Sequence, residues 1–346
     1  MLGIFVFLFN FLYFESMNFL RNSVLATVVY YDVFDFPLTL MEVFKYLINP
    51  ARISRIIDGI GELKVIDVAE ELDKLVGSQI IEEKNGFYFL AGRSDLFNLR
   101  IKRRKIADQK WKIFLRYCRW LSLAPHLRGI FASGSMALSN TEEKSDFDVL
   151  IIARSGRLYT CRFFLWVISS VLGFRRKKWE KIAPDKLCFN HYITDDALYV
   201  PHESLFNAQS YVNLKPAMID SELVDKFYSS NLWLNNYVYN FSVSKNFVMR
   251  NTEPNKFFLT FAKFCEAILD SVPGDLIEGI LRNIQQGRIE GDPVTYQSGG
   301  RVIFTDQELE FHPHSFEVKV LERYKLGLKK AGVISYIEEK DSGLLK

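Results

Sequence analysis

The sequence contains little cysteine, and its few cysteines are widely separated. Four occur in 346 residues, with no Cys-x-x-Cys pair and no histidine at zinc-ligand spacing from them: Cys118, Cys161, Cys188 and Cys265. Disulfide frameworks and cysteine-based metal sites place their cysteines in recognisable short spacings. We therefore expect reduced thiols, mostly in the core, and a cytoplasmic protein.

Net charge of either sign is also almost absent. The 44 basic residues exceed the 41 acidic ones by only +3, which excludes a pervasively cationic nucleic-acid binder. The charge is nevertheless unevenly distributed. Residues 100–112 contain seven cations and one acid (net +6), residues 154–181 eight cations and one acid (net +7), and residues 57–84 eight acids and three lysines (net −5). Attraction to phosphates must therefore come from the two basic clusters.

The N-terminal apolar run, Met1–Phe14, is too short to cross a membrane, because a spanning helix takes about 20 apolar residues. It also lacks the basic region and the small-residue cleavage site of a secretory signal. Three interpretations remain open: translation starts at Met17, the run is a buried helix, or it contacts a membrane surface. We favour the first, and we expect no transmembrane segment.

The overall composition, 49% hydrophobic and 25% charged, is that of an ordinary globular protein, and the length suggests two or three domains. Periodicity predicts three helices and a hairpin in residues 17–98. A basic amphipathic helix followed by alternating strands and helices is predicted for residues 99–200, and a mostly helical region for residues 201–346. The expected fold class is α+β.

Residues 17–98 predict a compact helical module with a hairpin. The first helix is expected near residues 19–31, and a second follows a turn in which Thr39 and Glu42 form a capping box. A third helix is expected over residues 66–76, and it precedes a hairpin with an Asn-Gly turn. This order resembles a winged helix-turn-helix. The third helix, however, has four acids and one lysine, which opposes the approach of DNA phosphates. We favour a structural or protein-contact role over DNA binding.

One motif combines residue types that bind metal ions and phosphates. An apolar strand at residues 129–132 runs into Ser133-Gly134-Ser135, and ten residues after Ser135 begins Ser-Asp-Phe-Asp, which leads into a second apolar strand. Because side chains alternate along a strand, Asp146 and Asp148 lie on one face, where two close carboxylates repel unless a cation lies between them. Oxygen ligands of this kind favour Mg²⁺. The glycine lets the backbone approach a phosphate closely, and a serine hydroxyl and helix N-terminal amides can hold the anion.

This order of strand, Gly-Ser turn, spacer and Asp-x-Asp strand is similar to the signature of the nucleotidyltransferase superfamily of the DNA polymerase β type. The resemblance implies a polymerase-β-like core with a mixed sheet. It implies that Asp146 and Asp148 are catalytic and bind Mg²⁺ or Mn²⁺, while Gly134 and Ser135, with Ser133, bind a nucleoside triphosphate. The implied reaction transfers a nucleoside monophosphate to a hydroxyl acceptor (RNA, protein or small molecule) and releases pyrophosphate. The alternative is that the two aspartates are surface charges and Gly134 an ordinary turn.

Superfamily members usually add a third carboxylate from a later strand, and here Asn190 occupies the expected position. The strand predicted over residues 187–193 has Leu187, Phe189 and Ile193 on one face and Cys188, Asn190 and Tyr192 on the other, and His191 is interpreted as a core histidine. An amide can bind a nucleotide or a metal but cannot act as a base. The alternatives flank the strand: Asp185, Asp195 and Asp196. The missing acid favours a second hypothesis, a nucleotide-binding regulatory pseudoenzyme whose winged module contacts a partner.

The basic cluster over residues 154–181 follows the Asp-x-Asp strand, where it suits a triphosphate or a polyanionic acceptor. We predict that Arg162 contacts the nucleotide, because an unpaired charge among its three aromatic neighbours is costly. For Arg175–Lys178 a phosphate contact and an exposed loop are equally favoured. His312 and His314 alternate along an extended segment, and we favour a structural or surface role for them over a metal site.

Overall fold

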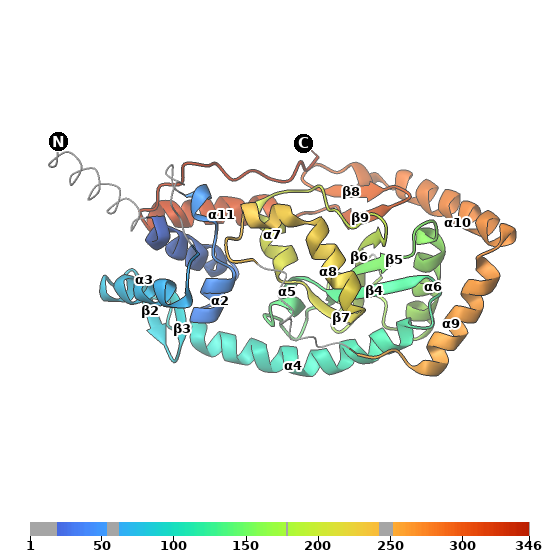
Figure 1. Ribbon diagram of the computed structural model, residues 1–346, viewed down its shortest axis with the longest axis horizontal. Coiled ribbons are helices and arrows are strands. Elements are labelled where there is room, and N and C mark those ends of the chain that lie inside the picture. The colour runs from blue at the N-terminus through green and yellow to red at the C-terminus, as the bar shows by residue number, and fades with distance from the viewer. Residues whose placement is uncertain (1–18, 54–61, 178, 242–251, 346) are drawn as a thin grey trace.

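The computed structural model describes residues 19–53, 62–177, 179–241 and 252–345. The molecule is built around a six-stranded sheet with the strand order β7-β4-β5-β6-β9-β8 (Figure 1). The bounds of these strands are Leu127–Ala132 (β4), Phe147–Ala153 (β5), Leu187–Thr194 (β6), Lys215–Ile219 (β7), Arg301–Phe304 (β8) and Glu308–His312 (β9). Strands β5 and β6 are parallel, and the other neighbouring pairs of this sheet are antiparallel. The fold is therefore α+β with a mixed sheet, as the sequence predicted.

Alternation along the central strands directs apolar side chains into two hydrophobic clusters, one on each face of the sheet. In β5, Leu150 and Ile152 belong to one cluster, and Val149 and Ile151 to the other. We call these the Leu150 face and the Val149 face. Helices α7 (Leu205–Val212) and α8 (Ser221–Ser230) cover the Leu150 face, and the Val149 face is covered by α4 (Leu96–Leu121), α6 (Leu158–Val171) and α10 (Val272–Glu290).

The N-terminal module, residues 19–93, contains the elements that the sequence predicted. A helix includes residues 19–32, and it is followed by β1 (Leu38–Thr39), α2 (Leu40–Lys45), η1 (Pro50–Arg52), α3 (Val65–Gly77), β2 (Ile81–Lys84) and β3 (Phe87–Leu90). The strands form an antiparallel sheet of order β1-β3-β2. The capping box is present, since Glu42 N donates to Thr39 Oγ1 at 3.3 Å and Thr39 N donates to Glu42 Oε2 at 2.9 Å.

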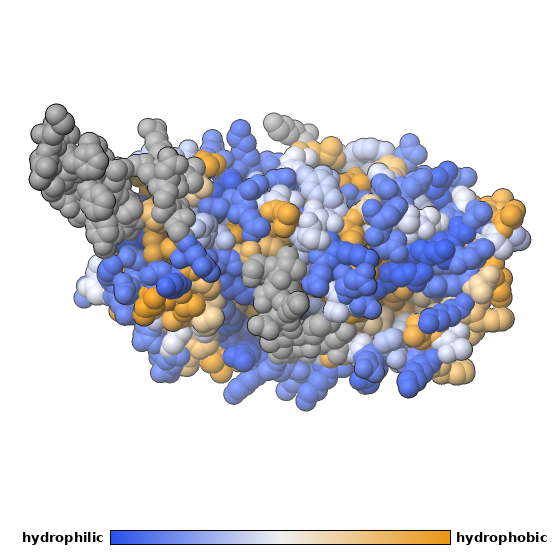
Figure 2. Space-filling model, viewed as in Figure 1, coloured by the Kyte–Doolittle hydropathy of each residue, from blue (hydrophilic) through white to orange (hydrophobic). Residues whose placement is uncertain are grey.

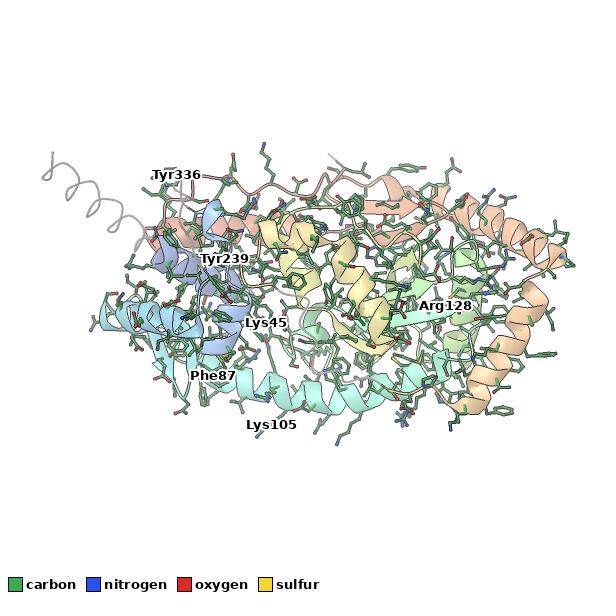
Figure 3. The ribbon with its side chains drawn as sticks, viewed as in Figure 1. Lys45, Phe87, Lys105, Arg128, Tyr239 and Tyr336 are labelled. Atoms are coloured by element: carbon green, nitrogen blue, oxygen red, sulfur yellow. The ribbon has the colours of Figure 1, made fainter. Side chains whose placement is uncertain are left out.

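Helix α4 runs beside both the N-terminal module and the sheet and connects them (Figure 1). Arg100 of α4 is buried and donates to Glu42 of α2 at 2.6 Å, and its guanidinium lies 3.5 Å from the centre of the Phe36 ring. Lys110 is buried and donates to Asp185 at 2.7 Å, whereas Lys105 projects into solvent (Figure 3). Part of the first basic cluster is therefore used to pack the module against the sheet, each buried cation having an acidic partner.

The region after residue 200, predicted to be mostly helical, also supplies three strands of the central sheet. Strands β7 and β8 have only five and four residues and lack a clear apolar alternation, and β9 alternates but over only five residues. The remaining elements are η2 (Leu232–Asn236), α9 (Lys256–Leu269), η3 (Pro293–Tyr296) and α11 (Glu317–Lys330). The domain bounds 17–98, 99–200 and 201–346 stay predictions, but the central sheet includes strands from both sides of residue 200.

Among the residues that the structure describes, no helix is long and apolar enough to cross a membrane. The apolar run Met1–Phe14 and the alternative start Met17 lie outside those residues, so the three interpretations of the run stay predictions. Exposed apolar side chains gather on α9 and α10 at one end of the molecule (Figure 2).

Candidate active site

The Gly-Ser turn lies directly against the Asp-x-Asp strand. Ser133 follows β4, and its backbone N–H donates to the Asp148 carbonyl at 3.0 Å; the single-turn helix α5 (Gly134–Ala137) begins at the next residue. Gly134 has a φ of +58°, and a Cβ added there would lie 2.7 Å from Asp148 Oδ2. Both observations require glycine, because an L side chain is strained at this φ and would collide with the carboxylate.

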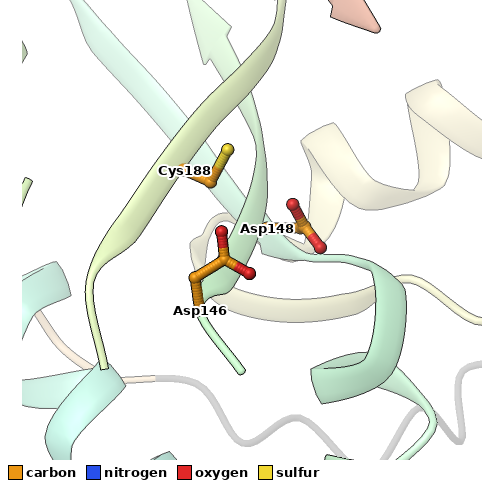
Figure 4. Close-up of side chains that lie close together, drawn as sticks. All are labelled: Asp146, Asp148 and Cys188. Atoms are coloured by element: carbon orange, nitrogen blue, oxygen red, sulfur yellow. The ribbon is translucent and has the colours of Figure 1, made fainter. Parts of the chain in front are cut away.

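Asp146 and Asp148 point into the same space (Figure 4). Asp146 precedes β5 and Asp148 is the second residue of that strand, while the intervening Phe147 is buried on the Val149 face. One oxygen of each carboxylate and Cys188 Sγ of β6 all lie within 4.8 Å of one another. The sequence-based prediction that the two carboxylates converge is thus confirmed.

The environment of this pair disfavours two negative charges. Burial and the neighbouring charge of Asp146 raise the pKa of Asp148 from 3.8 to about 6, against the opposing effects of His312, Arg176 and Asn190. Asp146 pairs with Arg176, whose guanidinium nitrogen lies 2.5 Å from a carboxylate oxygen. A divalent cation between the carboxylates would offset their repulsion, and two carboxylates together with phosphate oxygens are a donor set that suits Mg²⁺ or Mn²⁺. The thiol of Cys188 is a soft donor that Mg²⁺ does not favour.

Asn190 lies on the Asp148 side of β6, as the alternation from Cys188 predicted, and β6 is irregular at this residue. In the parallel pairing of β5 with β6, Asp148 lies opposite Cys188 and Val149 opposite Phe189, but Leu150 lies opposite His191, so Asn190 is an extra residue. Its side-chain amide donates to Asp148 Oδ1 at 2.8 Å.

The same bulge corrects the predicted alternation of this strand. Ile193 packs on the Leu150 face, whereas Leu187, Phe189 and Tyr192 pack on the Val149 face. The prediction that Ile193 shares a face with Leu187 and Phe189, opposite Tyr192, is wrong because the extra residue shifts the alternation by one position.

The three flanking aspartates have other partners. Asp185 accepts from Lys110 at 2.7 Å, Asp195 from the backbone N–H of Ser155 at 2.8 Å, and Asp196 from the Ser155 hydroxyl at 2.6 Å. Within the described part of the chain, the group of possible ligand atoms around Asp146 and Asp148 includes no third carboxylate.

Arg162 lies away from the carboxylate pair. It belongs to α6 and donates to Gln285 at 2.6 Å, and its guanidinium lies 4.9 Å from the centre of the Phe311 ring. Phe311 packs on the Val149 face, whereas Asp148 alternates with residues of that face and points to the opposite side. The structure therefore does not bring Arg162 together with Asp148.

Arg176 is the basic residue that reaches the carboxylates. Sequence reasoning included it only in a segment for which an exposed loop was equally favoured. Two other members of the basic cluster are paired with the junction between α9 and α10, Arg154 with Asp270 and Arg157 with Asp275. The cluster therefore divides between the candidate site and ion pairs that hold helices in place. The position of Arg176 beside the carboxylates depends on the order of the strands and on the path of the loop before β6, which the sequence does not reveal.

Comparisons with protein-family models, with curated proteins and with solved structures find no match to this chain. Its function is therefore inferred from the geometry of its own residues. The site combines a close-approach glycine turn, two converging carboxylates and one arginine at an edge of the sheet, an arrangement suited to binding a metal ion together with a phosphate ester.

Proposed function

We propose that this protein is a metal-dependent nucleotidyltransferase that moves a nucleoside monophosphate from a nucleoside triphosphate to a hydroxyl acceptor. The main support is that Gly134 and Asp148 are in contact: the turn that would bind phosphates and the carboxylates that would bind a cation form one site. A polymerase-β-like core is proposed with it, because the mixed pairing of β4, β5 and β6 presents both motifs at the same edge of a sheet.

In this proposal Asp146 and Asp148 hold Mg²⁺ or Mn²⁺, and the triphosphate lies against Gly134 and the hydroxyls of Ser133 and Ser135. When bound, the cation supplies charge stabilisation to the phosphates and activates the acceptor oxygen. The acceptor oxygen forms a bond to the α-phosphorus as the bond to the β-phosphate oxygen breaks, and pyrophosphate leaves. The hydroxyl proton passes to solvent, because Asn190 stands where a carboxylate base would be needed. The acceptor is a hydroxyl group of RNA, of a protein or of a small molecule.

The N-terminal module supports a protein-contact role in the same proposal. Its element order and its β1-β3-β2 sheet resemble a winged helix, but α3 has acidic side chains and Glu71 of that helix is buried against Lys74 at 2.7 Å. An acidic helix repels DNA phosphates, so we propose that the module contacts a protein partner.

The test is transfer from each α-phosphate-labelled nucleoside triphosphate, with Mg²⁺ or Mn²⁺, to cellular RNA, protein and small-molecule fractions. We expect metal-dependent transfer by the wild type and a loss of about 100-fold or more in Asp146→Asn and Asp148→Asn, because each removes a ligand charge. The exposed Asp225→Asn is the matched control and should transfer normally. Equal transfer by the wild type and both site variants contradicts the proposal.

A second candidate is a nucleotide-binding regulator without catalysis. Two observations favour it: Asn190 replaces a third carboxylate, and Arg176 already neutralises Asp146. This candidate predicts saturable nucleotide binding that is weakened in Arg176→Met, with no label transferred to any fraction.

A further inference from the structure

His312, the last residue of β9, is hydrogen-bonded to a carboxylate that the fold holds in place. Its Nδ1 lies 2.9 Å from Glu310 Oε1, and Glu310 is 1% exposed. Glu310 accepts from Arg301 Nε at 2.7 Å and from Arg301 Nη2 at 2.8 Å. Arg301 is fixed in turn, because its Nη1 donates to the Ser342 hydroxyl at 2.5 Å. The carboxylate beside His312 therefore has little freedom to move.

This carboxylate decides which nitrogen of His312 carries the proton. Burial raises the pKa of Glu310, but the hydrogen bonds from His312 and Arg301 outweigh burial and hold that pKa far below its usual value of 4.5. An ionised carboxylate only accepts hydrogen bonds, so His312 Nδ1 is the donor. In the neutral ring the lone pair then lies on Nε2. Because the His312 side chain is 40% exposed, a substrate oxygen can reach this nitrogen.

The end of β9 lies at the same edge of the sheet as the candidate active site. Strand β9 is antiparallel to β6, with His191 opposite Glu310, and continuing this register by two residues places His312 level with Phe189. Phe189 lies opposite Val149 of β5. His312 is therefore two strands away from Val149, and since neighbouring strands are about 4.8 Å apart, about 10 Å separate the two backbones.

The side chain of His312 also points to the same face of the sheet as the carboxylate pair. Phe311 packs on the Val149 face, so His312 points to the Leu150 face, as Asp148 does. Burial and the neighbouring carboxylate raise the pKa of Asp148, and the charge of His312 is the largest of the influences that lower it. Asn190, which replaces a third carboxylate, lies on the strand between them and donates to Asp148. An imidazole thus stands beside a site whose amide cannot accept a proton.

We propose that His312 is the general base of the nucleotidyl transfer, with Glu310 as the residue that positions its ring; this inference rests on the proposed function. As the acceptor oxygen bonds to the α-phosphorus, its proton moves to His312 Nε2. The bond from the α-phosphorus to the β-phosphate oxygen breaks, and pyrophosphate leaves with that electron pair. The Glu310 carboxylate stabilises the imidazolium, which then releases its proton to solvent. The hydroxyl proton reaches solvent by way of this ring.

The charges around His312 favour this transfer. The ionisable groups near His312 and Glu310 come from several elements: Arg301 of β8, Asp148 of β5, His191 of β6 and His202 of the segment before α7. The carboxylates of Glu310 and Asp148 both attract the imidazolium that the transfer forms. The guanidinium of Arg301 is directed at Glu310 by two hydrogen bonds, so its charge is offset there.

The test uses the α-phosphate-labelled nucleoside triphosphate and the cellular fraction that give transfer with the wild type. We expect His312→Gln to lower kcat by about 100-fold or more with little change in the nucleotide KM, because general-base catalysis contributes about 10²–10⁴-fold. Between about pH 5 and 8, where imidazoles titrate, the wild-type kcat should rise as the base loses its proton, and His312→Gln should lose this dependence. His314→Gln, at an exposed histidine, is the control and should keep both.

Rescue by imidazole distinguishes a base from a structural histidine. Imidazole added to His312→Ala should raise its kcat by about tenfold or more, because the free base can enter the space of the missing ring. It should not raise the activity of Asp148→Asn. Unchanged kcat in His312→Gln, or a loss of kcat in His312→Ala that imidazole does not reverse, overturns the role of His312 while the proposed function stands.

Absence of transfer by the wild type has a different meaning. It contradicts the proposed function, and the role of His312 falls with it. If His312→Gln fails to fold, His312→Ala decides alone, because its rescue compares one protein with and without imidazole.

Discussion

At the scale of single residues, two features require glycine at position 134, its positive φ and its close approach to Asp148, and experiments can separate them. Gly134→Ala places a Cβ 2.7 Å from Asp148 Oδ2 at a φ of +58°. We expect a loss of about 1–3 kcal/mol in the free energy of unfolding and displacement of the Asp148 carboxylate, with loss of nucleotide binding. Thermal unfolding and nucleotide titration measure the two effects.

Gly173→Ala is the matched control for this prediction. Gly173 has a φ of +77°, but an added Cβ would meet no atom within 4 Å, so only backbone strain remains. It should destabilise the protein by about 1 kcal/mol and leave nucleotide binding intact. Equal nucleotide binding by Gly134→Ala and Gly173→Ala would refute the role assigned to the contact with Asp148.

His126 is a single residue that should make stability depend on pH. Burial lowers its pKa from 6.5 to about 4. The charges of Glu266 and Asp270 raise this pKa, and the charges of Arg128 and Arg154 lower it further. Because the unfolded chain binds the proton more readily between pH 6.5 and 4, the folded state loses stability as the pH falls through this window. The expected loss in the free energy of unfolding reaches about 3 kcal/mol below pH 4, and it disappears as the pH rises above 6.5.

His126→Asn tests this prediction, since asparagine tolerates the positive φ of this position and does not titrate. Denaturant unfolding at pH 7, 6, 5 and 4.5 should show a smaller decrease in stability for the variant than for the wild type. The raised pKa of Asp148 acts in the opposite direction in both proteins and cancels in the difference. His314→Asn, at an exposed site, should follow the wild type. Parallel curves for wild type and His126→Asn would contradict the prediction.

At the scale of elements, the bulge in β6 sets the chemistry at the edge of the sheet. The extra residue is Asn190, whose amide donates to Asp148 where a carboxylate would instead complete a three-acid metal site. Asn190→Asp should tighten Mg²⁺ or Mn²⁺ binding by about tenfold, about 1.4 kcal/mol, and lower the stability of the metal-free protein by repulsion among three acids.

Metal titration and metal-free thermal unfolding measure these opposite effects. Asn190→Ala is the control, because it removes the hydrogen bond to Asp148 without adding charge, and it should not tighten metal binding. Weaker metal binding in Asn190→Asp than in the wild type would show that the carboxyl at this position does not face the cation.

At the scale of the whole molecule, one hydrophobic cluster joins parts of the chain that the sequence suggested to be separate. It includes Leu25 and Leu72 of the N-terminal module, Leu150 of the sheet, Phe227 of α8 and Tyr324 of α11, all buried. Parts that share a core unfold together, so we expect the module to unfold with the sheet rather than as an independent domain.

Leu25→Ala tests this cooperativity, because all five tryptophans lie outside residues 19–93. We expect the midpoint of denaturant unfolding followed by tryptophan fluorescence to fall by an amount that corresponds to about 2–5 kcal/mol. Ile66→Ala, at a side chain that is 59% exposed in the same module, should leave the midpoint nearly unchanged. An unchanged fluorescence midpoint in Leu25→Ala would show that the module unfolds separately.

Local sequence signals were sufficient for the elements whose stability depends on near neighbours. The capping box of Thr39 and Glu42, the helix α3 and the convergence of Asp146 and Asp148 all follow from spacings of two to four residues. Such spacings are set by the geometry of a helix or a strand, whatever the rest of the chain does.

Local sequence signals did not predict which distant segments pair with one another. The extra residue at Asn190, the choice of Arg176 rather than Arg162 beside the carboxylates, and the short strands β7, β8 and β9 depend on which strands become neighbours. The pairing of Glu308 with His191 has the same origin, because no spacing along the chain relates them. Periodicity reports how a segment buries its own side chains, whereas the partner of each polar group is chosen only when the sheet has assembled.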